Sequence, residues 1–193
     1  MANFRIFVEK YPEFQVEAES LRKELNENLQ IDLKSLRLLN VYDLFGFTPE
    51  LLEESRYKVF GETVTDMVSD SCDLDGTKYI AVEYLPGQFD QRAASAVDCV
   101  HLIDPAANVR IKSSKLIILE ESVTDEELAK IRHYYINPVE SRMKDLSVLS
   151  DSENAGVKPV PVLEGFTEMQ DSELEEYCHK MGLAMNADDL REV

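Results

Sequence analysis

The stretch SVTDEELAKIRHYY, residues 122–135, decides the fold because the stretch FTPELLEESRYKVF, residues 47–60, has the same pattern. In each stretch a threonine, Thr48 or Thr124, precedes acidic residues and leucines, as the N-cap of an amphipathic helix does. Leu52 matches Leu128 at the same shift of 76 residues. The sequence therefore predicts two equivalent helices, one in each of two related halves.

Outward from these helices, the similarity continues in both directions. VEKYP at 8–12 and VEYLP at 82–86 share Val, Glu and Pro at a shift of 74 residues. Hydrophobic periodicity predicts five elements in the first half: a strand at 3–10, a helix at 15–29, a strand at 36–45, a helix at 49–60 and a strand at 61–71. VDCVHLI, NVRIKSSKLIILEE and INPVE then fall where the second half needs a helix, a strand and the last strand. Self-similarity over this length indicates duplication of a whole β-α-β-α-β unit.

We therefore predict an α+β fold in which two tandem β-α-β-α-β units form a pseudo-dimeric antiparallel sheet covered by helices. The two sheets should meet about an internal pseudo-two-fold axis, as two subunits of a homodimer would. A chain that pairs with itself in this way is expected to be a monomer. The predicted core consists of Phe4, Ile6, Val8, Leu21, Leu25, Leu38, Val41, Tyr79, Ala81, Val97, Val100, Leu116, Ile118, Leu128 and Ile131.

Composition changes near residue 150. Residues 151–193 hold 11 acidic and 3 basic residues, and the stretch 150–165 contains two glycines, Pro159 and Pro161, which favour an extended linker. We therefore expect a duplicated domain over 1–149, with repeats at about 1–73 and 77–149, a linker over 150–165 and a helical segment over 166–193. Asn186 is a predicted N-cap of a short last helix, so we expect the natural chain to continue beyond Val193.

The net charge of −18 argues against partners with a phosphate backbone or an anionic lipid surface. No apolar run approaches the roughly 20 residues that a membrane span needs, and the first residues lack the profile of a secretory signal. We expect a cytoplasmic protein that binds neither nucleic acid nor membrane.

A search for catalytic or metal-binding motifs yields little. The three histidines stand singly, and the three cysteines, Cys72, Cys99 and Cys178, are far apart and are expected to be buried thiols. SCDLDG at 71–76 resembles a calcium loop, but Val82 stands where the bidentate glutamate should be, so a polar turn is the better interpretation. No glycine-rich phosphate-binding motif occurs. We expect neither a catalytic nor a metal site.

The segment LPGQFDQRAASA, residues 85–96, begins the first helix of the second unit. Asp90 is placed to cap this helix, and Arg92 lies in its first turn, where the helix dipole disfavours a cation. A cation there indicates an anionic partner, either a carboxylate of this chain or a group outside it.

Three separated motifs resemble a known family: AVEYLPGQFDQRAASA, YYINPVESR and LEGFTEMQDSELEEYCHKMGLAMNADDL. In this order they are similar to the amino-terminal region of large phosphoribosylformylglycinamidine synthase, and the resemblance covers nearly the whole chain. That family is a ligase of de novo purine synthesis that uses ATP and Mg and transfers ammonia from glutamine. The resemblance implies an accessory-subunit-like domain that is a fused pair, followed by the start of a helical linker domain.

The resemblance further implies that this region is inactive alone, holds no cofactor and docks on the synthetase and glutaminase domains of the same polypeptide. The predicted docking residues are Gln88, Asp90, Gln91, Arg92, Asn137, Glu140, Ser141 and Arg142. The alternative is a stand-alone regulatory module whose pseudo-two-fold cleft binds a small molecule. A purely structural, self-associating module is a third possibility, and it predicts a dimer.

Overall fold

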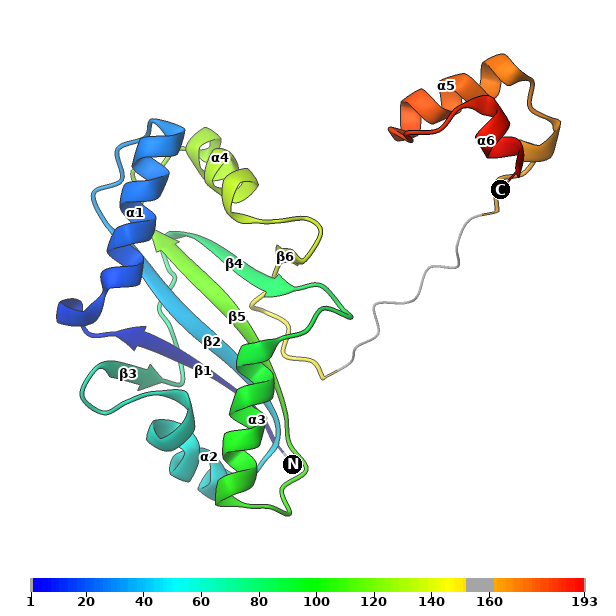
Figure 1. Ribbon diagram of the computed structural model, residues 1–193. Coiled ribbons are helices and arrows are strands. Elements are labelled where there is room, and N and C mark those ends of the chain that lie inside the picture. The colour runs from blue at the N-terminus through cyan, green and yellow to red at the C-terminus, as the bar shows by residue number, and fades with distance from the viewer. Residues whose placement is uncertain (1, 152–161, 193) are drawn as a thin grey trace. The chain divides into compact units, whose positions relative to one another are not determined.

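The computed structural model describes residues 2–151 and 162–192, which belong to two compact units, Met1–Glu153 and Asn154–Val193 (Figure 1). Most of the expected linker, residues 152–161, lies outside the described residues. The first unit contains the whole sheet, and the second is helical.

The sheet of the first unit is antiparallel and has six strands in the order β3-β1-β2-β5-β4-β6. Its elements are β1 (Ala2–Lys10), α1 (Val16–Leu29), β2 (Leu36–Phe47), α2 (Pro49–Ser55), β3 (Asp66–Ser69), β4 (Lys78–Tyr84), α3 (Gln91–Ile103), β5 (Arg110–Leu119), α4 (Asp125–Tyr135) and β6 (Ser141–Met143). A π-helical turn, Arg56–Phe60, continues α2. The predicted α+β class is therefore confirmed, and the element order is β-α-β-α-β twice.

Local signals in the sequence set the helix starts. The Thr48 side chain accepts a hydrogen bond from the Leu51 amide, and Thr124 forms a reciprocal capping box with Glu127. Asp90 caps α3 by accepting from the Ala93 amide. The three predicted caps are confirmed, and each satisfies a backbone N–H that the helix itself leaves without a partner.

Helices α1–α4 lie on one side of the sheet (Figure 1). Side chains alternate between the faces of a strand, so Ile6 and Val8 of β1 point to this side. They pack with Ala93, Ala96 and Val100 of α3 in one core cluster. A second cluster on this side joins α1 and α4 to the sheet through Leu25, Ile80, Ile117 and Ile131.

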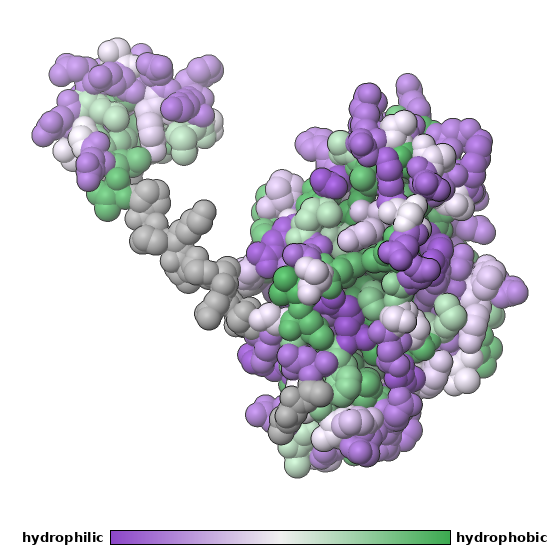
Figure 2. Space-filling view, turned by 180° about the vertical axis from the view of Figure 1, so that it is seen from behind, coloured by the Kyte–Doolittle hydropathy of each residue, from purple (hydrophilic) through white to green (hydrophobic). Residues whose placement is uncertain are grey.

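The other face of the sheet carries a third apolar cluster, away from helices α1–α4 of the first unit. It contains Phe7, Leu39, Val41, Ala81, Leu116 and Ile118, with Cys72, Leu74 and Leu146 packed against them from irregular segments. Viewed from behind, the molecule shows apolar side chains gathered between hydrophilic ones on this side (Figure 2). The core is thus divided between two faces, whereas we expected helices to cover a single buried face.

The predicted core is mostly correct but includes one exposed residue. Tyr79 is 37% exposed because β6 pairs only with Val82–Tyr84, which leaves the flank of Tyr79 without a neighbouring strand. Five other predicted core residues are only partly buried: Phe4, Leu21, Leu38, Val97 and Leu128. The expectation of buried thiols is wrong for Cys99, which is exposed, and holds for Cys178.

The second unit contains a 3-10 turn (Phe166–Glu168), α5 (Asp171–Met181) and α6 (Ala187–Glu192). Its small core consists of Leu174, Cys178, Ala187 and Leu190. The rings of Phe166 and Tyr177 pack against this core edge to face, with their centroids 5.6 Å apart. The predicted cap of the last helix is confirmed, because Asn186 Oδ1 accepts a hydrogen bond from the Asp189 amide. No helix within the described ranges of the two units is long and apolar enough to cross a bilayer.

Candidate functional site

The predicted docking residues lie in and beside two turns that contact each other. The turn between β4 and α3 meets the turn between α4 and β6, where the Leu85 amide donates to the Glu140 carbonyl at 2.8 Å. Gln88 Nε2 donates to the Val139 carbonyl at 3.3 Å. The structure therefore brings together two groups of residues that are about 50 positions apart in the sequence. We call this the two-turn surface, formed by Gln88, Phe89, Asp90, Gln91, Arg92, Asn137, Val139, Glu140, Ser141 and Arg142.

Three of these residues shape the turns. Asp90 accepts hydrogen bonds from the Ser113 amide and hydroxyl, each at 2.8 Å, in addition to capping α3. Asn137 Oδ1 accepts from the Val139 amide at 3.1 Å, and the Asn137 carbonyl accepts from the Ser141 amide at 2.8 Å. These polar groups form hydrogen bonds within the chain, so we infer that Asp90, Asn137 and Ser141 hold the two turns in shape rather than bind a partner.

Two apolar side chains on the two-turn surface are missing from the residues predicted as docking sites. Phe89 and Val139 are each 75% exposed. In the sequence each of them stands alone between polar residues or turn formers, in GQFDQ and NPVES. This isolation was the sequence signal that could have identified them as exposed. The structure adds that the two turns that carry them are in contact, and exposed apolar side chains rimmed by polar residues mark binding surfaces.

Arg92 has no ion-pair partner among the described residues. Its nearest polar contact is the Tyr42 hydroxyl, 3.5 Å from Nη1. Burial opposes its charge, but the Tyr42 hydroxyl and the more distant carboxylates of Glu17 and Asp90 raise the pKa of Arg92. A direct pair with a carboxylate, one of the two partners expected for this cation, is therefore not present in the described part of the chain.

A pocket of about 200 Å³ opens beside Arg92 on the helix-covered side of the sheet. We call it the central pocket, and the residues that matter for its chemistry are Asn40, Arg92, Ser113, Lys115, Tyr135 and Glu140. Asn40 and Lys115 are directly paired across the β2–β5 ladder. Burial, followed by the charges of Glu17 and Glu24, raises the pKa of Tyr135, so its hydroxyl stays protonated at neutral pH.

The central pocket contains a polar side chain that makes no hydrogen bond within the described chain. Asn40 Oδ1 is buried and has no partner. Lys115, in contrast, forms an ion pair with Glu17 at 2.7 Å. An unpaired buried oxygen costs free energy unless something binds it, so Asn40 is the residue of this pocket that most requires an explanation.

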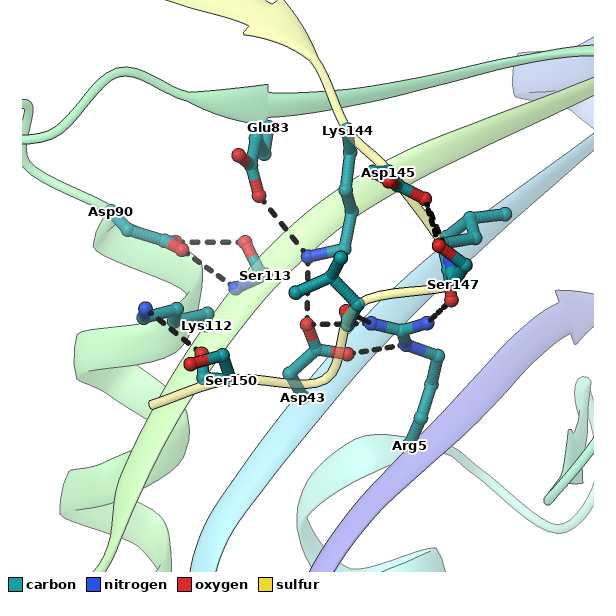
Figure 3. A network of polar contacts seen from close by, with 12 residues as sticks. Arg5, Asp43, Glu83, Asp90, Lys112, Ser113, Lys144, Asp145, Ser147 and Ser150 are labelled. Carbon is teal, nitrogen blue, oxygen red and sulfur yellow. Dashed lines mark hydrogen bonds and ion pairs between the residues drawn. The ribbon is translucent and has the colours of Figure 1, made fainter. Parts of the chain in front are cut away.

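The opposite face of the sheet carries a charged network (Figure 3). Lys144 Nζ lies 2.7 Å from Asp43 Oδ2 and 3.2 Å from Glu83 Oε2, and Arg5 Nε lies 2.5 Å from Asp43 Oδ1. Arg142 of the two-turn surface pairs with Glu83 at 2.8 Å. Arg5 also donates to the Leu146 and Val148 carbonyls, which holds the segment after β6 on the sheet. Sequence reasoning missed this network because its members lie on four separate strands and loops.

No group of three metal-ligating side chains that could hold an ion is found in residues 2–151 and 162–192. Comparison with models of known protein families gives no match, and no curated protein sequence matches the chain.

Proposed function

We propose that this chain is a non-catalytic assembly part of phosphoribosylformylglycinamidine synthase, a cytoplasmic ligase of purine synthesis. In this proposal it docks on the synthetase domain of the same polypeptide and helps to couple that domain to the glutaminase. ATP and Mg would act in the synthetase domain, and this chain would contribute by holding the reacting domains in position.

The observation that carries this proposal is the two-turn surface. Two hydrogen bonds join the two separate turns, and each turn exposes one large apolar side chain, Phe89 or Val139, among polar residues. Exposed apolar side chains with polar neighbours are typical of protein interfaces. Arg142 forms an ion pair with Glu83, which belongs to the charged network. This ion pair would limit the movement of the two-turn surface relative to the sheet.

We further propose that the first unit is a fused pair of duplicated units. The strand register supports this proposal. Val8 pairs with Asn40 on one side and Val68 on the other, and Val82 pairs with Lys115 and Met143 in the same way. Because Asn40 also pairs with Lys115, the two halves would meet there about a pseudo-two-fold axis. A fused pair would be a monomer in sedimentation, whereas a self-associating module would be a dimer. The second unit would then be the start of the linker domain.

Reconstitution tests the docking role. The remaining domains of the enzyme are expressed separately, and glutamine-dependent amidine formation is assayed with and without this chain. We expect the chain to restore activity and the double variant Phe89→Ser/Val139→Ser to restore at most about a tenth of it, since buried apolar anchors dominate interfaces. Leu102→Ser is the matched control, because Leu102 is 86% exposed on α3 outside the two-turn surface. If the double variant and the control restore activity equally, the two-turn surface is not the docking site. If folded pieces neither bind nor regain activity, the assembly role is wrong.

The second candidate is a stand-alone regulatory module that binds a small molecule, and the central pocket favours it. The two candidates differ in whether a partner protein is needed. A chain that binds a ligand but restores no activity in reconstitution would support the second candidate.

A further inference from the structure

We propose that the first unit carries a second protein-docking surface, whose partner presents apolar side chains beside lysine or arginine. It lies where the connection between β1 and α1 meets the turn before β3. We call it the first-half surface, formed by Tyr11, Glu13, Phe14, Glu62 and Val64. The inference rests on the assembly role for the source of the partner, one of the remaining domains of the enzyme, and adds a second contact to that role.

The two segments of the first-half surface are joined in the same way as the turns of the two-turn surface. The Tyr11 amide donates a hydrogen bond to the Thr65 carbonyl at 2.9 Å. In the two-turn surface, the Leu85 amide donates to the Glu140 carbonyl at 2.8 Å. Each of these bonds ties the residues after a strand to the last residue before the neighbouring edge strand, β3 or β6. The two surfaces therefore share one backbone framework.

The turns before the two edge strands also match. The Glu62 carbonyl accepts hydrogen bonds from the amides three and four residues further along the chain, at 3.2 and 2.8 Å. The Asn137 carbonyl accepts from the amides at the same two positions, at 3.1 and 2.8 Å. Val64 stands two residues before β3, and Val139 stands two residues before β6. Both valines are exposed, each by about three quarters: 76% for Val64 and 75% for Val139.

The aromatic residues of the two surfaces occupy matching positions as well. Phe14 stands two residues before α1, and Phe89 stands two residues before α3. Phe14 is 43% exposed, and the neighbouring Tyr11 is 36% exposed. Exposed apolar side chains with polar neighbours mark binding surfaces. The features for which the two-turn surface is assigned a docking role thus occur a second time in this unit.

The charges of the first-half surface indicate the chemistry of its partner. Lys10, at the base of the surface, pairs with Asp66 at 2.9 Å. Neither Glu13 nor Glu62 forms an ion pair within the part of the chain that the structure describes. Opposite charges attract across an interface, so the partner needs lysine or arginine beside its apolar contact. A second copy of this chain, with a net charge of −18, is a less favourable occupant because it would be repelled.

The two surfaces differ in charge and would therefore bind different partners. The two-turn surface has two anions and two cations: Asp90, Glu140, Arg92 and Arg142. The first-half surface with its base has three anions and one cation: Glu13, Glu62, Asp66 and Lys10. A chain occupied at both surfaces would hold two domains at once.

The first experiment asks whether the two surfaces bind different domains. The synthetase and glutaminase domains are expressed separately, and the affinity of the chain for each is measured by sedimentation. We expect Phe14→Ser/Val64→Ser to bind one domain at least about tenfold more weakly and the other as the unaltered chain does, since a few apolar anchors dominate an interface. Phe89→Ser/Val139→Ser should show the opposite loss. Leu102→Ser, the exposed control on α3, should lose neither.

The outcomes separate this inference from the assembly role. If the unaltered chain binds the domains and a folded Phe14→Ser/Val64→Ser variant binds both equally well, the second surface is overturned and the assembly role stands. If the unaltered chain binds neither domain, the assembly role is wrong and the second surface is overturned with it. If the chain forms a dimer that this variant abolishes, the occupant is a second copy and the proposed partner is wrong.

A charge reversal tests the chemistry of the partner. Glu13→Lys/Glu62→Lys should slow association with the same domain about tenfold at low salt, and the effect should shrink at about 0.5 M salt, where exposed charges are screened. Glu27→Lys/Glu121→Lys is the control, because it makes the same change in net charge at two exposed glutamates outside the surface. Equal effects of the two variants overturn the assignment of a basic partner to the first-half surface.

Discussion

Lys144 Nζ lies 2.7 Å from Asp43 Oδ2, and these two side chains, 101 residues apart, are both buried on the sheet face away from the helices. Asp43 is 3% and Lys144 is 7% exposed. Arg5 pairs with the same carboxylate, so Asp43 balances the buried Lys144 and the partly buried Arg5. The Asp43–Lys144 ion pair, together with Arg5, holds the segment that follows β6 against strands β1 and β2.

Asp43→Ala should therefore lower the free energy of unfolding by about 3–5 kcal/mol, because it removes the only carboxylate that pairs with Arg5 among the described residues and leaves the buried Lys144 with Glu83 alone. Urea denaturation at neutral pH measures the change. Asp32→Ala is the control: its partner Lys34 is exposed, as is Asp32 itself, and exposed pairs contribute little. Equal effects of the two substitutions would contradict a stabilising role for the buried network.

Asp66 should make stability depend on acid pH. Burial opposes its ionisation, but hydrogen bonds from the Glu62 amide, Lys10 and Thr65 outweigh burial and lower the pKa of Asp66. A lowered pKa in the folded state contributes stability above the unfolded value of about 3.9, and this stability is lost as pH falls through the folded pKa.

We therefore expect Asp66→Asn to cost about 1–3 kcal/mol at pH near 7 and much less in strong acid. Urea midpoints of the two proteins at a series of pH values give the difference. A difference that stays constant from neutral pH down to the acid limit of folding would refute the link to ionisation.

Gly46 should tolerate no side chain. Its φ is +78°, and a Cβ would lie 2.4 Å from the Asn108 carbonyl oxygen. Gly76 is a matched control, since it has a φ of +69° with no atom within 4 Å of a Cβ. Gly76→Ala should cost about 1 kcal/mol for the left-handed backbone alone, and Gly46→Ala should cost more because backbone must also move. Chemical denaturation of the two variants isolates the steric cost, and equal losses would show that the loop before β5 adapts freely.

Alkylation of the three cysteines should follow their exposure. Cys99 is exposed, Cys72 is partly buried and Cys178 is buried. Burial, together with Glu9 and Asp73, raises the pKa of Cys72 although Arg37 opposes this, so less of its reactive thiolate is present at neutral pH. We expect iodoacetamide to modify Cys99 first and Cys178 last, as peptide mass spectrometry would show. Modification of Cys178 as fast as Cys99 would mean that the core of the second unit opens readily.

Much of the secondary structure could be predicted because it depends on neighbouring residues. The N-caps Thr48, Thr124, Asp90 and Asn186 occupy the helix starts that the sequence predicts. The period of apolar residues predicted the strands and helices of the first unit, and the cap Asp90 predicted where α3 begins. The sequence could not show that irregular segments would cover one sheet face, since such segments have no periodic pattern.

The candidate site was predictable only in part. The unusual polar residues of two separate turns could be recognised from the sequence, and the isolation of Phe89 and Val139 among them was a signal that we did not use. The unpaired Asn40 could not be distinguished there, because its lack of a hydrogen-bond partner depends on the strands around it.

The sequence by itself determined the helix starts, the order of the elements and the polar character of the two turns, because capping, periodicity and turn chemistry act over a few residues. Only the tertiary structure decided that Gln88 meets Val139, that Asp43 meets Lys144 and that Asn40 faces Lys115 beside an unpaired Arg92. These contacts depend on strand register between distant segments, and a shift of one residue would turn each of these strand side chains to the opposite face.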